Sequence, residues 1–209
     1  MTPILQLVDL NQSFGAVKVA DGISFEVNEG EALGVIGPNG AGKTSMFNLI
    51  TGTLTSQSGR IFFNGDDISQ FTAAARSRLG VARSFQVPQP FGRLTVFENA
   101  MVAATQSAGL RGRAAEDLCV DVLDRTGLLQ KANSRARNLT LLERKRLELA
   151  RALCTKARLL LLDEIAGGLT EAECNLLVRL IKEIKTEGTT IVWIEHVVHA
   201  LLEVVDRLV

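Results

Sequence analysis

The sequence predicts an α/β fold with a mostly parallel central sheet, an antiparallel β layer near the start and a helical insertion. Short, nearly continuous apolar runs occur at 32–36, 159–162 and 190–194, as in strands buried on both faces of a parallel sheet. An amphipathic stretch over roughly 171–187 separates the last two runs, which gives the strand–helix–strand order of a parallel crossover. A helical stretch over 95–155 interrupts this alternation, so we expect it to form a subdomain.

The first segments of the chain show the alternation of apolar and polar residues that is typical of strands. Residues 4–10 and 23–27 alternate in this way and are followed by turn residues, which suits an antiparallel layer. Residues 59–65 resemble a further strand, at the edge of this layer, that ends in an Asn-Gly turn. The apolar run 32–36 then begins the buried core.

A phosphate-binding loop follows that first buried run. Residues 37–44 fill every fixed position of the pattern G-x-x-x-x-G-K-[ST], between a predicted strand and a helix that begins at Lys43. Glycines let backbone N–H groups face a polyphosphate, while Lys43 can reach the β- and γ-phosphates and the Thr44 hydroxyl can ligate Mg²⁺. We expect the nucleotide to be contacted by Gly37, Pro38, Asn39, Gly40, Ala41, Gly42, Lys43, Thr44 and Ser45.

Helix-forming segments dominate the middle of the chain. The expected elements are helices at 71–79, 95–107, 112–130 and 141–155 and a short strand at 81–85. Pro88 and Pro90 make the chain irregular after that strand. We expect one domain over 1–209, in which 1–86 and 156–209 form the core with the β layer and about 87–155 form the helical subdomain. Since 206–209 look like the opening of another strand, we also expect the sequence to end inside the domain.

Two carboxylates directly follow the apolar run 159–162. A buried parallel strand delivers Asp163 and Glu164 at its carboxyl end, where ligands of open α/β sheets bind. Asp163 is then a ligand of Mg²⁺, and Glu164 is a general base that polarises the attacking water. Alone, the pair would suit an acidic turn, but the complete phosphate loop favours catalysis. His196 follows the last buried run, where its imidazole can contact a γ-phosphate.

Composition excludes several classes of protein. Lys plus Arg and Asp plus Glu both number 23, so the chain lacks the basic footprint of a nucleic-acid binder and we expect no nucleic-acid partner. Three scattered cysteines, Cys119, Cys154 and Cys174, indicate reduced thiols in a cytosolic protein. The sequence shows no signal peptide and no apolar run long enough to cross a bilayer, so we expect any membrane role to come through a partner.

With these motifs in order, the chain resembles the ATP-binding subunits of ABC transporters over essentially its whole length. The resemblance implies a P-loop NTPase (RecA-like) core with an antiparallel β subdomain and an inserted helical subdomain. Gln86, in Arg83-Ser84-Phe85-Gln86, matches the family's glutamine loop, which touches both Mg²⁺ and the permease. His196 matches the switch histidine. Phe14 takes the place of the aromatic that stacks on adenine, although the residues alone leave a core role equally open.

Within this family the chain looks most like the ATPases of branched-chain amino acid importers, whose features are shared by importers of urea and short amides. The segments that carry this likeness are 83–86, 94–99, 146–153, 166–169 and 194–196. The resemblance implies ATP hydrolysis that powers import, by a peripheral subunit at the cytoplasmic face of the inner or plasma membrane. It implies as partners transmembrane permease subunits, a second ATP-binding subunit in a homo- or heterodimer and, indirectly, a solute-binding protein.

The chain departs from the family pattern at three places. The signature, close to Leu-Ser-Gly-Gly-Gln, contacts ATP across a dimer and aligns here with residues 139–143, so that its positions are held by Thr140, Leu141, Leu142 and Glu143. Leu142 adds bulk where the family has glycine, and Glu143 repels an anion unless its side chain turns away. Residues 165–169 lack the usual proline and aspartate, and the family pattern continues with strands and a tail past Val209.

These departures leave several functions open. The leading hypothesis is an ATPase that couples hydrolysis to import, in a heterodimer whose paralogous partner supplies a better signature. A nucleotide-binding regulatory subunit with little hydrolysis is the alternative, which Leu142 and Glu143 favour and Glu164 opposes. ABC-type proteins of translation or DNA repair usually carry two cassettes or long coiled-coil inserts, and neither occurs here. A GTPase is disfavoured because the sequence has no Asn-Lys-x-Asp motif.

Overall fold

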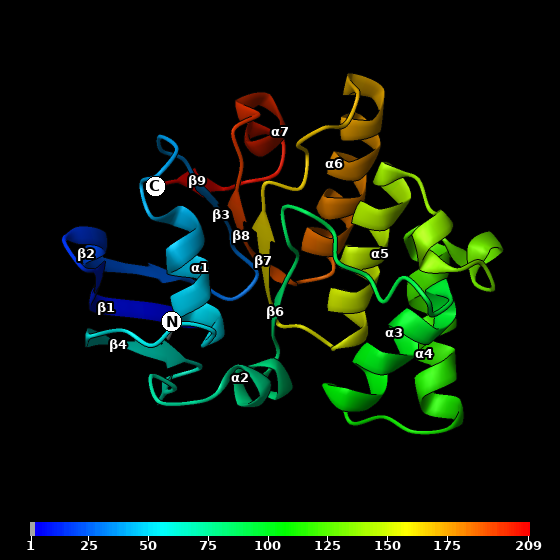
Figure 1. The fold of residues 1–209 in the computed structure, drawn as a ribbon, viewed down its shortest axis with the longest axis horizontal. Coiled ribbons are helices and arrows are strands. Elements are labelled where there is room, and N and C mark those ends of the chain that lie inside the picture. The colour runs from blue at the N-terminus through cyan, green and yellow to red at the C-terminus, as the bar shows by residue number, and fades with distance from the viewer. Residues whose placement is uncertain (1–2) are drawn as a thin grey trace.

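Two sheets and a group of helices make up residues 3–209, the part of the chain that the computed structural model describes (Figure 1). The antiparallel sheet has the order β2-β1-β4-β5, and its strands are β1 (Leu5–Phe14), β2 (Val17–Val27), β4 (Ser58–Phe63) and β5 (Asp66–Asp67). The parallel sheet has the order β6-β7-β8-β3-β9, and its strands are β3 (Ala32–Val35), β6 (Val81–Arg83), β7 (Leu159–Asp163), β8 (Thr190–Ile194) and β9 (Arg207–Leu208).

The helices fall into two groups around the parallel sheet. Those that pack on the sheets are α1 (Lys43–Thr51), α2 (Ala73–Leu79), α6 (Glu171–Thr186) and α7 (Val198–Leu202). Those that gather at the end of the molecule opposite the antiparallel sheet are α3 (Val96–Gln106), α4 (Arg113–Arg125) and α5 (Leu141–Cys154), with short 3₁₀ turns at Leu129–Lys131 and Ala136–Asn138 (Figure 1). The predicted fold class is confirmed.

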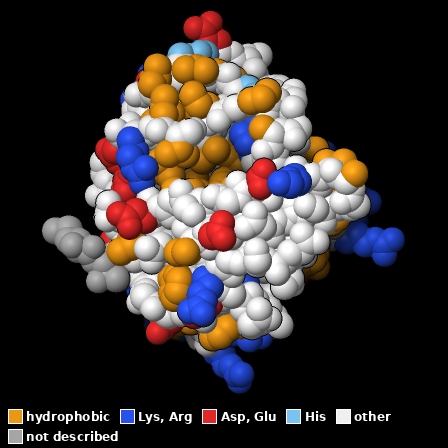
Figure 2. Space-filling model, turned by 90° about the vertical axis from the view of Figure 1, so that its left-hand side faces the viewer, with side chains coloured by type: hydrophobic (Ala, Val, Ile, Leu, Met, Phe, Trp, Pro, Cys, Tyr) orange, Lys and Arg blue, Asp and Glu red, His pale blue; other side chains and the backbone are white. Residues whose placement is uncertain are grey.

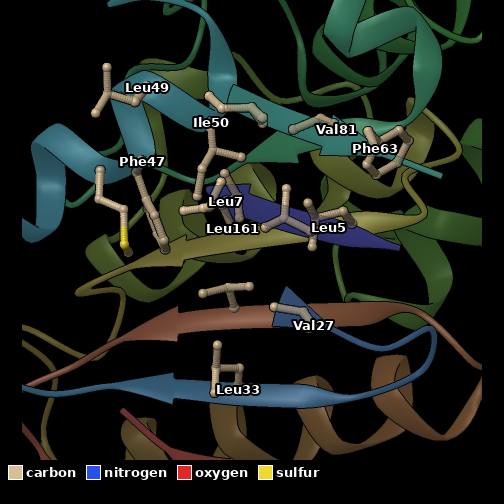
Figure 3. Close-up of a cluster of buried hydrophobic side chains, with 14 of the residues drawn as sticks. Leu5, Leu7, Val27, Leu33, Phe47, Leu49, Ile50, Phe63, Val81 and Leu161 are labelled. Carbon is tan, nitrogen blue, oxygen red and sulfur yellow. The ribbon is translucent and has the colours of Figure 1, made fainter. Parts of the chain in front are cut away.

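The core lies in three clusters of buried side chains, and the first of them fixes the phosphate loop. In this cluster α1 fills the space between the two sheets, with Phe47 and Ile50 lying over Leu7 of β1 and Leu161 of β7 (Figure 3). All four side chains are fully buried or nearly so. Because α1 begins at the phosphate loop, this packing holds the loop rigidly against both sheets. The second cluster lies beneath α6 and α7, and the third joins α3, α4 and α5.

Arg76 of α2 supports the other end of α1. Its guanidinium is buried and donates hydrogen bonds to the carbonyls of Leu49 and Ile50 at 2.6 and 2.9 Å, and to those of Ser69 and Phe71 at 2.9 and 3.1 Å. The last carbonyls of a helix have no partner within the helix, so these bonds satisfy groups that would otherwise be buried unpaired. Burial lowers the pKa of Arg76 from its ordinary value.

The prediction that 59–65 form an edge strand is wrong. Strand β4 lies between β1 and β5, and the short β5 is the edge. Asn64 and Gly65 both adopt positive φ, 53° and 86°, as in a two-residue hairpin turn that lays the following residues beside β4. The helical stretch predicted over 112–130, with its end near Gly127, is the shorter helix α4, which ends at Arg125; the chain then turns at Gly127, where φ is 69°. The subdomain boundaries at 86–87 and 155–156 stay a prediction.

The surface at the antiparallel end of the molecule carries charges of both signs. Figure 2 shows basic and acidic side chains interspersed there, with apolar side chains gathered mainly in the upper part of the face. This face therefore presents no extended field of one sign. Within residues 3–209, no helix combines the length and the apolar character that a membrane crossing requires.

Replacement of Arg76 by methionine should lower the free energy of unfolding by about 3 kcal/mol, because four backbone carbonyls lose a buried donor. Arg78→Met on the exposed side of the same helix is the matched control and should change it by less than about 0.5 kcal/mol. Urea unfolding followed by circular dichroism measures both, and equal effects would show that the Arg76 contacts add nothing to stability.

Candidate nucleotide-binding and catalytic site

The loop between β3 and α1 has the geometry of an anion site. Among residues 3–209 no side chain caps the N-terminus of α1, so the N–H groups of its first turn are left for a ligand. Lys43 lies back across the loop and donates hydrogen bonds to the carbonyls of Gly37 and Pro38 at 2.7 and 2.9 Å. The ammonium is therefore held at the rim of the loop, where a phosphate would enter. The loop residues 39–45 line a cavity of about 280 Å³.

Strand β2 forms one wall of this cavity, which the sequence did not predict. A Cβ atom at Gly42 would lie 2.1 Å from the carbonyl oxygen of Val19, and Gly42 has a φ of 86°. Only glycine fits this close approach, so the loop is pressed against the backbone of β2. Val19 itself lines the cavity together with Glu164. Because the contact uses the backbone of an ordinary strand residue, no side-chain signal in the sequence could have revealed it.

Phe14 lies at the exposed tip of the β1–β2 hairpin, next to Gly15, whose φ is 57°. Its side chain is 56% exposed, which excludes the core role that the sequence left open. The aromatic ring is available to a planar ligand, although Phe14 is not among the residues that line the cavity at the phosphate loop. Stacking on adenine stays a prediction.

Asp163 ends β7 in a buried ion pair. Its Oδ2 accepts a hydrogen bond from Arg83 at 2.6 Å, and its Oδ1 is buried without any hydrogen-bond partner within residues 3–209. Arg83 also donates to Asn48 of α1 at 2.5 Å and lies over the rings of Phe47 and Phe85. A buried carboxylate oxygen without a donor suits a cation, so Asp163 and the Thr44 hydroxyl have the oxygen chemistry that Mg²⁺ requires.

Glu164 stands between two side chains that reach it from other strands. Its Oε2 accepts a hydrogen bond from the amide nitrogen of Gln86 at 2.5 Å, and its Oε1 lies 2.8 Å from Nε2 of His196. Glu164 has a φ of 48°, a left-handed conformation that costs a residue with a side chain on the order of 1 kcal/mol. The three residues predicted to be catalytic thus meet beside the phosphate loop, at the carboxyl ends of β6, β7 and β8.

Glu195 is a supporting residue that the sequence did not single out. It is 2% exposed, and its two carboxylate oxygens accept hydrogen bonds from the backbone N–H groups of Ala166 and His196, at 2.9 and 3.0 Å. These bonds tie the loop after Glu164 to the end of β8. Residues 165–169 contain no proline, and the buried carboxylate fixes this loop.

The signature positions begin α5, and Glu143 turns back onto the helix. Thr140 is the N-cap, and its hydroxyl accepts from the N–H of Glu143 while the Glu143 carboxylate accepts from the N–H of Thr140 at 2.9 Å. Burial acts to raise the pKa of Glu143, but hydrogen bonds from Lys131 and Thr140 outweigh it and hold the pKa below its usual value. A carboxylate therefore already occupies the N-terminus of α5, where an anion would bind. Leu141 lies against Gly168.

Comparison with known proteins gives consistent results. Residues 20–167 match the family model described as "ABC transporter". The chain is 36% identical to the high-affinity branched-chain amino acid transport ATP-binding protein LivG of Salmonella typhimurium, over 99% of this chain and 87% of that protein. It is 33% identical to BraF of Pseudomonas aeruginosa, a protein with the same description, at the same coverage.

Solved structures with this fold include two ATP-binding cassettes of ABC transporters, one nucleotide-free and one in its ADP conformation. Both are 28% identical to this chain and superpose with a TM-score of 0.88. They cover 99% and 100% of this chain, which in turn spans 87% of each.

Replacement of Gly42 by alanine should weaken ATP binding by about tenfold or more, because the new methyl group collides with the Val19 carbonyl. Gly40→Ala is the matched control, since Gly40 has a similar φ of 82° but no atom within 4 Å of an added Cβ. Its loss should be smaller, about threefold or less. Titration with a fluorescent ATP analogue measures both, and equal losses would contradict the role of the β2 contact.

Proposed function

Because this chain belongs to the ABC transporter family, we propose that it is the ATP-hydrolysing subunit of an importer for branched-chain amino acids or related small amides. The observation that carries the proposal is the meeting of Glu164, Gln86 and His196 beside a complete phosphate loop. The solute assignment rests on the relatives, which are described as branched-chain amino acid transport ATP-binding proteins.

In the proposed reaction a water molecule attacks the γ-phosphate of ATP, the bond to the β–γ bridging oxygen breaks, and ADP and inorganic phosphate leave. Glu164 orients this water and accepts its proton, while the N–H groups of the loop and the Lys43 ammonium bind the phosphates. The contact from Gln86 holds one carboxylate oxygen of Glu164, and that from His196 holds the other. The His196 side chain is partly exposed, and we propose that it contacts the γ-phosphate and so senses hydrolysis.

The same residues fit Mg²⁺ as a cofactor. Thr44, Gln86 and Asp163 are the proposed ligands, each through an oxygen. The amide nitrogen of Gln86 is engaged with Glu164, whereas its amide oxygen accepts no hydrogen bond within residues 3–209. When bound, Mg²⁺ neutralises the negative charge on the β- and γ-phosphate oxygens.

A groove between the core and the helical group is the proposed contact for a permease subunit. It has a volume of about 280 Å³ and is lined by side chains of α2, β6, α3 and α5. Phe85 and Phe91 are more than 40% exposed there, and each lies under an arginine side chain, Arg83 or Arg151. Exposed aromatic residues beside a groove suit an apolar segment of a partner. Through this contact the subunit would be peripheral, at the cytoplasmic face of the membrane.

The second proposed partner is a paralogous ATP-binding subunit. In a head-to-tail dimer each ATP lies between one phosphate loop and the signature of the other subunit. Here the phosphate loop is complete, while Glu143 occupies the N-terminus of α5 and Leu142 adds bulk beside it. A partner with a less obstructed signature would complete the ATP bound to this chain. A solute-binding protein would act on the permease and not on this subunit directly.

Glu164→Gln should lower the rate of ATP hydrolysis by roughly 100- to 1,000-fold, since the amide accepts no proton from the attacking water. Affinity for ATP should stay within about twofold, because the phosphate loop is unchanged. Glu171→Gln, at the exposed start of α6, is the matched control and should leave hydrolysis intact. Phosphate release by the assembled transporter is the measurement, and full turnover with Glu164→Gln would refute the assignment of the base.

The Glu164→Gln protein should remain a monomer in light scattering with Mg²⁺-free ATP, because its own signature does not accept a phosphate. Adding Leu142→Gly and Glu143→Gln should allow an ATP-dependent homodimer, since both obstacles are removed. A stable dimer before these two changes would favour a symmetric motor and contradict the heterodimer.

A further inference from the structure

Three side chains of helix α5 form hydrogen bonds with the backbone of the glutamine loop. Lys145 donates to the carbonyl of Gln86 at 3.4 Å, Glu148 accepts from the N–H of Gln89 at 3.0 Å, and Arg151 donates to the carbonyl of Gln89 at 3.1 Å. The three residues are spaced three apart and therefore share one face of the helix. Arg151 also donates to Glu148 at 2.9 Å, which joins two of the contacts.

These charged side chains are buried to an unusual degree. Lys145 is 3% exposed and Glu148 is 4% exposed. Burial lowers the pKa of Lys145 and raises the pKa of Glu148. Charged groups are rarely placed in such surroundings unless something compensates them, and here the compensation is contact with a loop that has little secondary structure of its own.

Lys145 is also influenced by the charges of two carboxylates at the strand ends. Glu195 and Glu164 are the two charges that favour its protonated form, and the cation lies beyond direct ion-pair distance from either. From other elements, Lys145 thus faces the Gln86 carbonyl after β6, to which it donates, and is near the charges of Glu164 after β7 and Glu195 after β8. The Lys145 ammonium of the helical group therefore interacts electrostatically with residues that follow all three strands.

We propose that Lys145, Glu148 and Arg151 are positioning residues that fasten residues 86–89 to α5 and so set the Gln86 side chain against Glu164. The inference rests on the proposed function, since it assigns these residues to the hydrolysis at Glu164. The contact path runs from the helix to the loop backbone, from the Gln86 amide to the carboxylate at 2.5 Å, and from there to His196.

This arrangement has a mechanical consequence within one chain. The signature positions 140–143 lie at the start of α5. Lys145, Glu148 and Arg151 follow on the next turns of the same helix. A helix moves as a rigid body, so a displacement of its N-terminus is carried to residues 86–89. The position of the signature against a partner subunit would then be transmitted to the base of this subunit.

The test is Lys145→Met, which keeps the bulk of the side chain and removes its charge and its hydrogen bond to the Gln86 carbonyl. In the assembled transporter we expect kcat for ATP hydrolysis to fall about tenfold while KM for ATP stays within about twofold. Lys145→Arg, which keeps a buried cation donor, should restore most of the rate. Lys182→Met removes an exposed lysine that pairs with Glu203 on the surface, and it should change neither constant.

A double-mutant cycle with Gln86→Ala separates positioning from a general structural effect. If Lys145 acts through the Gln86 side chain, Lys145→Met should lower kcat by less than about twofold once that side chain is gone. Equal losses in both backgrounds, or no loss in either, would overturn the proposal. If Lys145→Met does not fold, the same double-mutant cycle can be measured with Arg151→Met, because Arg151 is more exposed.

A failure of the positioning role can be distinguished from a failure of the proposed function. Glu164→Gln reports on the base itself. If that variant hydrolyses ATP normally, the assignment of the base is wrong whatever Lys145 does. If Glu164→Gln is inactive and the cycle shows additive losses, only the positioning role is overturned.

Discussion

The ion pair between Arg83 and Asp163 is the constraint on which the site depends. It joins the ends of β6 and β7, and the second arm of the same guanidinium holds Asn48 of α1. Both side chains are almost wholly buried, at 7% and 3% exposure, so either charge without the other would be costly. The phosphate loop, which leads into α1, and the carboxylates, which end β7, therefore keep a fixed relation to each other.

A second constraint is the left-handed backbone at Glu164. Strain of this kind persists only where the surroundings over-determine the conformation. Here the Glu164 N–H donates to Ile194 at 2.8 Å, Gln86 and His196 contact the carboxylate, and Glu195 fixes the loop that follows. The contacts that would prepare Glu164 for a water molecule are the same ones that make its conformation stable.

The sequence predicted those parts of the structure that depend on contiguous residues. The phosphate loop, the start of α1 at Lys43 and the carboxylates at the end of β7 each follow from a local pattern. The partners of these residues could not be predicted, because Arg83, Val19 and Glu195 act through contacts between distant segments. Arg83 and Asp163 are 80 residues apart, and the Val19 contact involves only backbone. The prediction that β4 is an edge strand was wrong for a related reason. The turn after β4 lays β5 beside it, and this pairing is known only from the assembled sheet.

The capping box at Thr140 and Glu143 is a common device for beginning a helix, and here it lies where a nucleotide contact is expected. The Glu143 carboxylate neutralises the partial positive charge at the N-terminus of this helix. In a heterodimer the two nucleotide sites would then differ: one would be completed by the partner's signature and turn over ATP, and the other would face a helix whose positive end is already neutralised. The stoichiometry of ATP to solute would accordingly be set by only one of the two nucleotide sites.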